Sequence, residues 1–213
     1  MGEDSAMDNI IITISRGYGS NGVAIGKLAA KLLGINYYDD ASLREMASSW
    51  LRRAMDDLDD LPPEDAEVAY EDVFRMQIGQ VRELSERESF VIMGRAADYF
   101  LRDIPNIIRI SIHSDFDECV TTVAERDGIS REEAAKKIHS IDAQRAEFYQ
   151  RHTGSLWDDG MSFDLTLNSS SIGSVSCAEL IARYLDIWRR HHGFAYNTRR
   201  PQRPLFLCHS RLS

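Results

Sequence analysis

The pattern of apolar and polar positions divides much of the chain into short strands and amphipathic helices. Residues 9–15 form an apolar run rich in β-branched side chains, which predicts a buried strand that ends in a glycine-rich turn. From Gly22 the apolar positions recur with the period of a helix, and Gly34 is suited to the position just after its end. The first part of the chain therefore predicts a strand, a glycine turn and a helix, in that order.

The rest of the chain continues this alternation. Further strands are predicted at residues 35–38, 89–94, 107–113 and 163–168. Further helices are predicted at residues 41–56, 64–88, 130–151 and 174–190, with another after Ser114. Strands separated by helices predict an α/β fold with a five-stranded parallel sheet covered on both faces.

Two of the predicted helices begin with capping signals. Ser114 is followed three residues later by Asp117, and Ser130 is followed at the same spacing by Glu133. A hydroxyl with an acid at this spacing is typical of a capping box, and the second pair is the clearer one. Both signals predict where a helix starts, so they help to fix the helix boundaries.

The glycine turn has the spacing of a phosphate-binding loop without its usual lysine. In the stretch ISRGYGSNGVAIGK, Gly17 and Gly22 are spaced as in such loops, but Val23 and Ala24 follow where lysine and a hydroxyl residue are usual. Such loops bind phosphate mainly through backbone N–H groups and the start of the next helix. The loop alone leaves two interpretations open, a phosphate site or a simple turn.

Arg16 is the cation nearest to this turn in the sequence. An arginine can bind phosphate through two parallel hydrogen bonds, so Arg16 is a candidate substitute for the lysine. Lys27 lies one helical turn beyond the loop, and we expect it to be too far away. Asn21 stands at a turn position where a positive φ is tolerated better by asparagine than by most residues.

Composition and charge narrow the class of protein. Hydrophobic residues make up 43% and charged residues 28% of the chain, and no apolar run approaches the roughly 20 residues of a membrane span. The acidic N-terminus lacks the features of a signal peptide, so we expect a cytoplasmic protein without a membrane partner. The three cysteines are far apart and predict neither a disulfide framework nor a metal site.

The net charge of −9 is unevenly distributed. Residues 189–213 carry six arginines and no acid, so the rest of the chain is more acidic than the whole. An acidic body is a poor general binder of nucleic acid, and we expect no nucleic-acid partner. The basic tail remains open to two interpretations, a solvated extension or a segment that binds an acidic partner.

Four segments together resemble one family, the cytidylate kinase-like proteins, a branch of the nucleoside monophosphate kinases. The resemblance extends over about residues 9–187, and the order and spacing of the segments are more specific than any one of them. The segments are IITISRGYGSNGVAIGKLAAKLLGINYYD, VIMGRAAD, RDGISREEAAKKIHSIDAQRAEFYQRHTG and FDLTLNSS, which begin at Ile11, Val91, Arg126 and Phe163.

This resemblance implies a three-layer P-loop kinase fold with a five-stranded parallel sheet. It implies a helical substrate-binding insertion at about 40–88 and a helical lid at about 126–154, within one domain at 1–188. The basic tail at 189–213 would follow this domain. Nothing in the sequence fixes the oligomeric state.

The resemblance also implies ATP- and Mg²⁺-dependent phosphoryl transfer to a nucleoside monophosphate, with CMP or dCMP as the expected acceptor. The expected donor site comprises Ser15, Gly17, Tyr18, Gly19, Ser20, Asn21 and Gly22. The expected catalytic cations are Arg16, Arg145 and Arg151, with Asp142 as a partner that orients a lid arginine. The expected acceptor site comprises Gly94, Arg95 and Asp98.

Because the loop lysine is absent, a second interpretation stays open. The chain would then be a nucleotide-binding regulatory protein with weak catalysis or none.

Overall fold

The structure is a computed structural model that describes residues 9–47, 53, 63–94 and 96–192. Its centre is a five-stranded sheet in the order β2-β3-β1-β4-β5, in which all paired strands are parallel. This confirms the predicted α/β class and sheet. The strands are β1 (Ile11–Arg16), β2 (Asn36–Tyr38), β3 (Phe90–Met93), β4 (Ile107–His113) and β5 (Leu165–Asn168).

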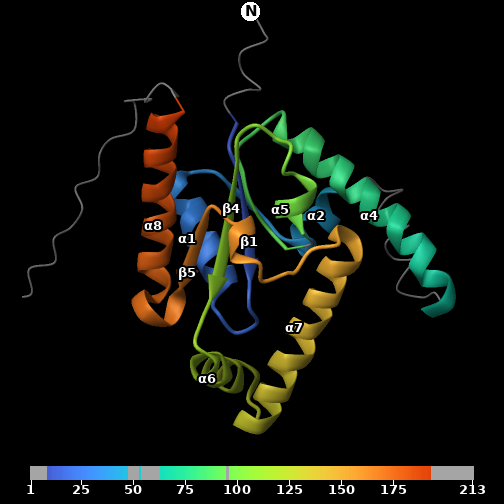
Figure 1. The fold of residues 1–213 in the computed structure, drawn as a ribbon, viewed down its shortest axis with the longest axis vertical. Helices are drawn as coiled ribbons and strands as arrows, with labels where there is room; N and C mark the ends of the chain where they lie inside the picture. Colours follow the sequence, from blue (N-terminus) through green and yellow to red (C-terminus); the bar gives the residue numbers. More distant parts are fainter. Residues whose placement is uncertain (1–8, 48–52, 54–62, 95, 193–213) are drawn as a thin grey trace, which may run out of the picture.

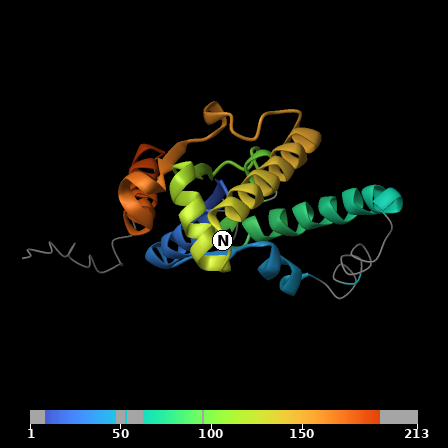
Figure 2. The same cartoon turned by 90° about the horizontal axis from the view of Figure 1, so that it is seen from below.

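Helices cover both faces of this sheet (Figure 1). α1 (Gly22–Leu33) and α8 (Ser169–His191) pack on one face, where alternate strand residues such as Ile12 and Ile14 form the larger core cluster. The other face carries α2 (Asp40–Met46), α4 (Pro63–Ser85) and α5 (Ala97–Phe100). Figures 1 and 2 place α8 and α4 on opposite sides of the sheet, which gives three layers.

Two further helices form a unit at the carboxyl end of the sheet. α6 (Phe116–Asp127) and α7 (Arg131–Thr153) pack on each other around a separate apolar cluster that includes Val123 and Ile138. In Figure 1 they lie beyond the ends of β1 and β4, at the edge where parallel sheets bind ligands. α7 falls within the region at about 126–154 where a lid is expected, whereas most of α6 precedes that region.

The two capping predictions had different outcomes. Ser130 and Glu133 form the predicted capping box at the start of α7, which confirms that prediction. The prediction for Ser114 was wrong, because α6 is preceded by Asp115 and has no side-chain cap. The Ser114 hydroxyl instead lies 2.6 Å from the hydroxyl of Ser170, near the start of α8.

Some boundaries also differ from those predicted. The sequence analysis missed α5, a helix of four residues, because so short a helix shows no apolar period. α8 begins at Ser169, before the predicted start, and Gly173 with φ of 76° interrupts it. α2 ends at Met46, and most of residues 47–56, where the predicted helix continued, lie outside the described part of the chain. Much of the acidic connector, Arg95 and the basic tail from residue 193 onward also lie outside it.

Membrane association through a spanning helix finds no support in the described part of the chain. None of its helices combines the length and the apolar character that a membrane span requires.

Candidate active site

The glycine turn forms a loop between β1 and α1, at the carboxyl end of the sheet. Gly19 has φ of 89° and Asn21 has φ of 58°, so both lie in the left-handed region. The second value confirms that asparagine supplies a positive φ here. The amide of Ile25 then donates to the Asn21 carbonyl, which starts α1 directly behind the loop.

Serine hydroxyls hold the loop in shape. Ser20 is buried, and its hydroxyl donates to the carbonyl of Gly17 at 2.9 Å. Ser169, at the start of α8, donates to the carbonyl of Ser20 at 2.9 Å and lies 3.1 Å from that of His113. The Ser20 side chain therefore supports the loop from within, and the sequence analysis missed Ser169 although it lies in the quoted segment FDLTLNSS.

Two glycines make room for the side chain of Arg16. A Cβ atom on Gly22 would lie 2.6 Å from the Arg16 Cβ, which is closer than real atoms approach. A Cβ atom on Gly94 would lie 3.1 Å from the Arg16 Nη1, and Gly94 has φ of 91°. Glycine thus stands at the start of α1 and just after β3, where the side chain of Arg16 passes. A larger residue at either position would crowd that side chain.

The surroundings of Arg16 leave its charge incompletely matched. Its Nε is buried and has no hydrogen-bond partner among the described residues. Burial lowers the pKa of Arg16, and the nearby positive charge of Arg145 lowers it further, while Asp40 and Asp142 act in the opposite direction. An arginine stays protonated in such a place, so the arrangement favours an additional anionic group.

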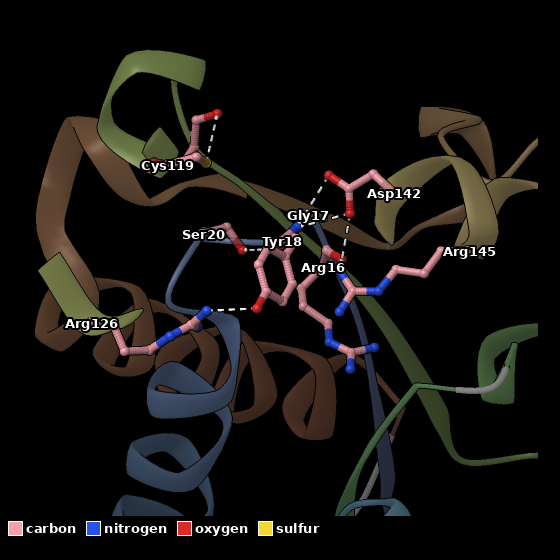
Figure 3. A network of polar contacts seen from close by, with 9 residues as sticks. Arg16, Gly17, Tyr18, Ser20, Cys119, Arg126, Asp142 and Arg145 are labelled. Atoms are coloured by element: carbon pink, nitrogen blue, oxygen red, sulfur yellow. Dashed lines mark hydrogen bonds and ion pairs between the residues drawn. The ribbon is translucent and has the colours of Figure 1, made fainter. Parts of the chain in front are cut away.

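Helix α7 contacts the loop through a carboxylate and an arginine (Figure 3). The amide of Tyr18 donates to both carboxylate oxygens of Asp142, at 2.9 and 3.2 Å. Arg145 Nη1 donates to Asp142 Oδ1 and to the Arg16 carbonyl, each at 3.1 Å. Asp142 thus has the contact with Arg145 that an orienting role requires, and it also occupies a loop N–H that a phosphate oxygen would use.

The side chain of Tyr18 fastens the loop to the lid. Arg126 donates to its phenol oxygen at 2.6 Å, and the ring lies 5.0 Å from the Arg126 guanidinium and 5.5 Å from that of Arg145. The ring also packs on the cluster between α6 and α7 (Figure 3). This position favours a packing role for the ring over stacking on a nucleotide base.

A cavity of about 410 Å³ opens beside the loop, between the sheet and α7. Five of the predicted site residues line it, although they come from different elements and from distant parts of the sequence. They are Ser15, Arg16, Gly94, Asp98 and Arg145.

Arg151 was also predicted for the site, but it is not among the residues that line this cavity. Arg151 is exposed and donates to Glu147 one turn earlier on α7, at 2.8 Å. Lys27 lies 5.5 Å from the ring of Tyr37, which agrees with the expectation that it does not serve the loop. Arg95 lies outside the described residues, so its expected role stays a prediction.

The sequence analysis missed several lining residues. Thr13 belongs to β1 and Asp40 to α2, while Tyr149 and Phe148 come from α7 and Trp157 follows it. Thr13 carried a weak signal, as the one polar residue between isoleucines in the first strand. Phe148 and Tyr149 lie in the quoted segment that begins at Arg126, but the sequence did not show that they line a cavity, because only the fold brings the end of α7 over the sheet.

Metal ligands do not identify a site by themselves. Within the residues for which the structure gives positions, no group of three or more His, Cys, Asp or Glu side chains is placed to hold a metal ion. This does not conflict with Mg²⁺, which is commonly bound by one or two carboxylates together with substrate phosphates.

Comparison with known families decides the affiliation of the chain. The model of the cytidylate kinase-like family matches residues 11–171, which include the loop, the cavity and the lid. The chain belongs to the cytidylate kinase-like family.

Solved structures agree with this affiliation. An uncharacterized protein from Eubacterium ventriosum is 27% identical with a TM-score of 0.70, over 84% of this chain and 99% of that one. Shikimate kinase from Acinetobacter baumannii, in complex with shikimate, is 14% identical with a TM-score of 0.52, over 86% and 96%. TT1252 from Thermus thermophilus is 20% identical with a TM-score of 0.51, over 86% and 97%. No curated protein sequence matches significantly.

The chain therefore has a P-loop kinase fold, as the cytidylate kinase-like family and its structural neighbours show. Membership in the family supports nucleotide-dependent phosphoryl transfer as the general chemistry of the site.

Proposed function

We propose that the protein transfers a phosphoryl group from ATP to a nucleoside monophosphate, with CMP or dCMP as the acceptor. The family supports phosphoryl transfer in general, and the choice of CMP or dCMP rests on the family resemblance. The observation that carries the proposal is the cradled Arg16, a buried and incompletely paired cation where the loop meets the cavity.

The geometry suits the main requirement of phosphoryl transfer. This reaction needs positioning of two substrates and positive charge around the phosphoryl group that moves, and little covalent help. Arg16 and Arg145 both line the cavity, and Arg145 reaches the loop backbone from α7. These two arginines would supply the charge from opposite sides, one from the sheet and one from the lid.

The two substrates would occupy opposite sides of Arg16. The donor phosphates would bind the loop at Gly17–Gly22, where backbone N–H groups and the start of α1 favour anions. The acceptor would bind in the cavity, next to Gly94 and Asp98. Arg95 directly follows Gly94 in the sequence, and we propose that it contributes to binding of the acceptor phosphate.

The residues present fit ATP with Mg²⁺. The unpartnered Arg16 Nε and the Tyr18 amide, which already donates to a carboxylate, are N–H groups that can donate to phosphate oxygens. Mg²⁺ would come with the ATP phosphates, whose charge it would help to neutralise during transfer. The protein groups would bind and orient the phosphates and would exclude water when α7 lies over them.

One observation favours the second candidate function, a regulatory protein that binds nucleotide without turnover. Asp142 holds a loop N–H in place of a phosphate, in a loop that also lacks its lysine. Arg145, which lines the cavity from α7, opposes this alternative, since simple binding has less need of positive charge from a lid.

Product formation distinguishes the two functions. The protein is incubated with Mg-ATP and each common nucleoside monophosphate, and the nucleotides are separated by chromatography. The proposal predicts CDP or dCDP, and much less of it from an Arg95→Ala variant. Saturable ATP binding without diphosphate product from any monophosphate would support the regulatory function instead.

A further inference from the structure

The strand β1 is polar where it passes under the cavity. Strands of parallel sheets are buried on both faces and are normally apolar throughout. Ile11, Thr13 and Ser15 point to the same face because side chains alternate along a strand. Ile11 packs in the core beside Phe90, whereas Thr13 and Ser15 line the cavity.

Thr13 is an unusual wall residue. Its side chain is only 1% exposed, and its hydroxyl has no hydrogen-bond partner among the residues that the structure describes. Buried hydroxyls are nearly always hydrogen-bonded, so the unpartnered hydroxyl of Thr13 is a candidate to bind a group in the cavity that this residue lines. Threonine is not needed for the strand itself, because valine has a similar shape and suits a strand as well.

A buried pair of side chains lies on the wall of the same cavity. Asp98, in the first turn of α5, is 6% exposed, and Tyr149 on α7 is 3% exposed. The tyrosine hydroxyl donates to Asp98 Oδ2 at 2.6 Å. Burial raises the pKa of Asp98, although the Tyr149 hydrogen bond acts in the opposite direction. A carboxylate has further acceptor sites, so Asp98 can also bind a donor in the cavity.

We propose that Thr13, Asp98 and Tyr149 form the specificity end of the acceptor site. They would select an anionic acceptor whose neutral part, sugar or base, carries a hydroxyl or amino group. The inference rests on the proposed function, because it takes the cavity as the acceptor site. It adds residues and a chemical requirement that the family membership does not provide.

The position of these residues relative to Arg16 supports a mononucleotide-sized ligand. Thr13 and Arg16 are three residues apart on one strand, which separates their Cα atoms by about 10 Å. The cavity lining combines two cations, Arg16 and Arg145, with the polar side chains of Thr13 and Asp98. A ligand that fits both is charged at one end and carries a hydrogen-bond donor at the other.

Selection follows from the cost of leaving buried polar groups unpaired. A site built to bind a hydroxyl or amine rejects an analogue without it, because the protein groups then stay buried without partners. One missing hydrogen bond of this kind weakens binding by about 10- to 100-fold. Thr13→Val removes the buried hydroxyl, and Asp98→Asn replaces one carboxylate oxygen by an NH2 donor, so each is expected to reduce the discrimination.

Calorimetry without ATP tests the inference on CMP, dCMP and UMP. Wild-type protein is expected to bind dCMP or UMP at least about tenfold more weakly than CMP. Weaker binding of dCMP would identify the sugar 2′-hydroxyl as the selected group. Weaker binding of UMP would identify the base amino group. Thr13→Val or Asp98→Asn is expected to reduce the difference to within about threefold, whereas Thr121→Val, a control on α6 outside the cavity lining, should keep it.

Equal binding of the three nucleotides by the wild type would overturn the inference. So would an unchanged preference in both variants, or binding of none of the three. If Thr13→Val does not fold, Tyr149→Phe provides a second test, because it removes only the hydroxyl that holds Asp98.

The same variants separate this inference from the proposed function. Diphosphate formation with a preference that the variants leave unchanged would overturn the inference and leave the kinase function intact. A preference that the variants relax, without any product from Mg-ATP, would overturn the kinase function and leave the inference intact.

Discussion

In the proposed function, Arg16 takes the place of the usual loop lysine from a different direction. A lysine after the second glycine would approach the phosphates from the start of α1, whereas Arg16 comes from the end of β1. Its side chain passes Gly22 and Gly94, and both positions lack the Cβ atom that would obstruct it. The planar guanidinium can then bind two phosphate oxygens at once, which a lysine cannot do.

Removing this cation should weaken donor binding. We expect Arg16→Ala to weaken the binding of ATP by about 10- to 100-fold, the range for a lost charged hydrogen bond. Lys27→Ala is the matched control, because Lys27 belongs to α1 and its ammonium group lies over the ring of Tyr37. Calorimetry with Mg-ATP measures both, and two variants with wild-type affinity would show that Arg16 does not bind the donor.

At the residue scale, the sequence predicted positions better than orientations. Arg16, Gly94 and Asp98 follow strands, and parallel strands bring their carboxyl ends together, so these residues do meet at one cavity. Arg151 is on a long polar helix, where a shift of a few residues turns a side chain away from the sheet. Thr13 carried only a weak signal in the sequence, because its place beside a cavity depends on the fold.

At the scale of elements, α7 does more than cover the site. Its Asp142 binds the Tyr18 amide and its Arg145 binds the Arg16 carbonyl, so one turn of the helix is fixed to the loop. A phosphate that binds the same amide must displace the carboxylate, and both carry negative charge. Donor binding and movement of α7 are therefore expected to be coupled.

Neutralising this carboxylate should strengthen donor binding. We expect Asp142→Asn to bind Mg-ATP several-fold more tightly than the wild type, because a negative competitor for the Tyr18 amide is removed. Glu132→Gln makes the same charge change in the first turn of α7, where Glu132 pairs with Lys136, and should leave the affinity unchanged. Unchanged or weaker binding by Asp142→Asn in calorimetry would show that the carboxylate does not compete with phosphate.

The outcome of the element predictions depended on how local each signal was. The Ser130 capping box needs only residues within one turn, and it formed as predicted. Ser114 has a similar pattern, but Ser170 lies within hydrogen-bond distance and Asp115 precedes the helix instead. A contact with a residue far along the chain thus overrode a local preference, and the sequence pattern had no means to show this.

At the scale of the whole molecule, two partly buried phenols make the free energy of unfolding depend on pH in the alkaline range. Burial raises the pKa of Tyr37 to about 12, with Asp39 acting in the same direction. Burial also raises the pKa of Tyr38 to about 12, helped by its hydrogen bond to Glu88. In the unfolded chain these phenols have their ordinary pKa near 10.

The sign of the effect follows from this difference. Because the folded-state pKa is the higher one, the unfolded chain loses its phenol protons first as the pH rises. The stabilisation is complete below pH of about 10 and is lost as the pH rises toward about 12. The free energy of unfolding, measured with urea, should therefore fall over this interval, and it should fall less in Tyr38→Phe. An equally steep fall in that variant would contradict the assignment.

The central claim is that this chain is a kinase that uses Arg16 in place of the loop lysine. The most direct test is transfer of the labelled γ-phosphoryl group of ATP to CMP, measured for the wild type and for Arg16→Ala. The account predicts labelled CDP from the wild type and a rate at least about tenfold lower from the variant. No labelled diphosphate with CMP or dCMP, or equal rates for the two proteins, would contradict it.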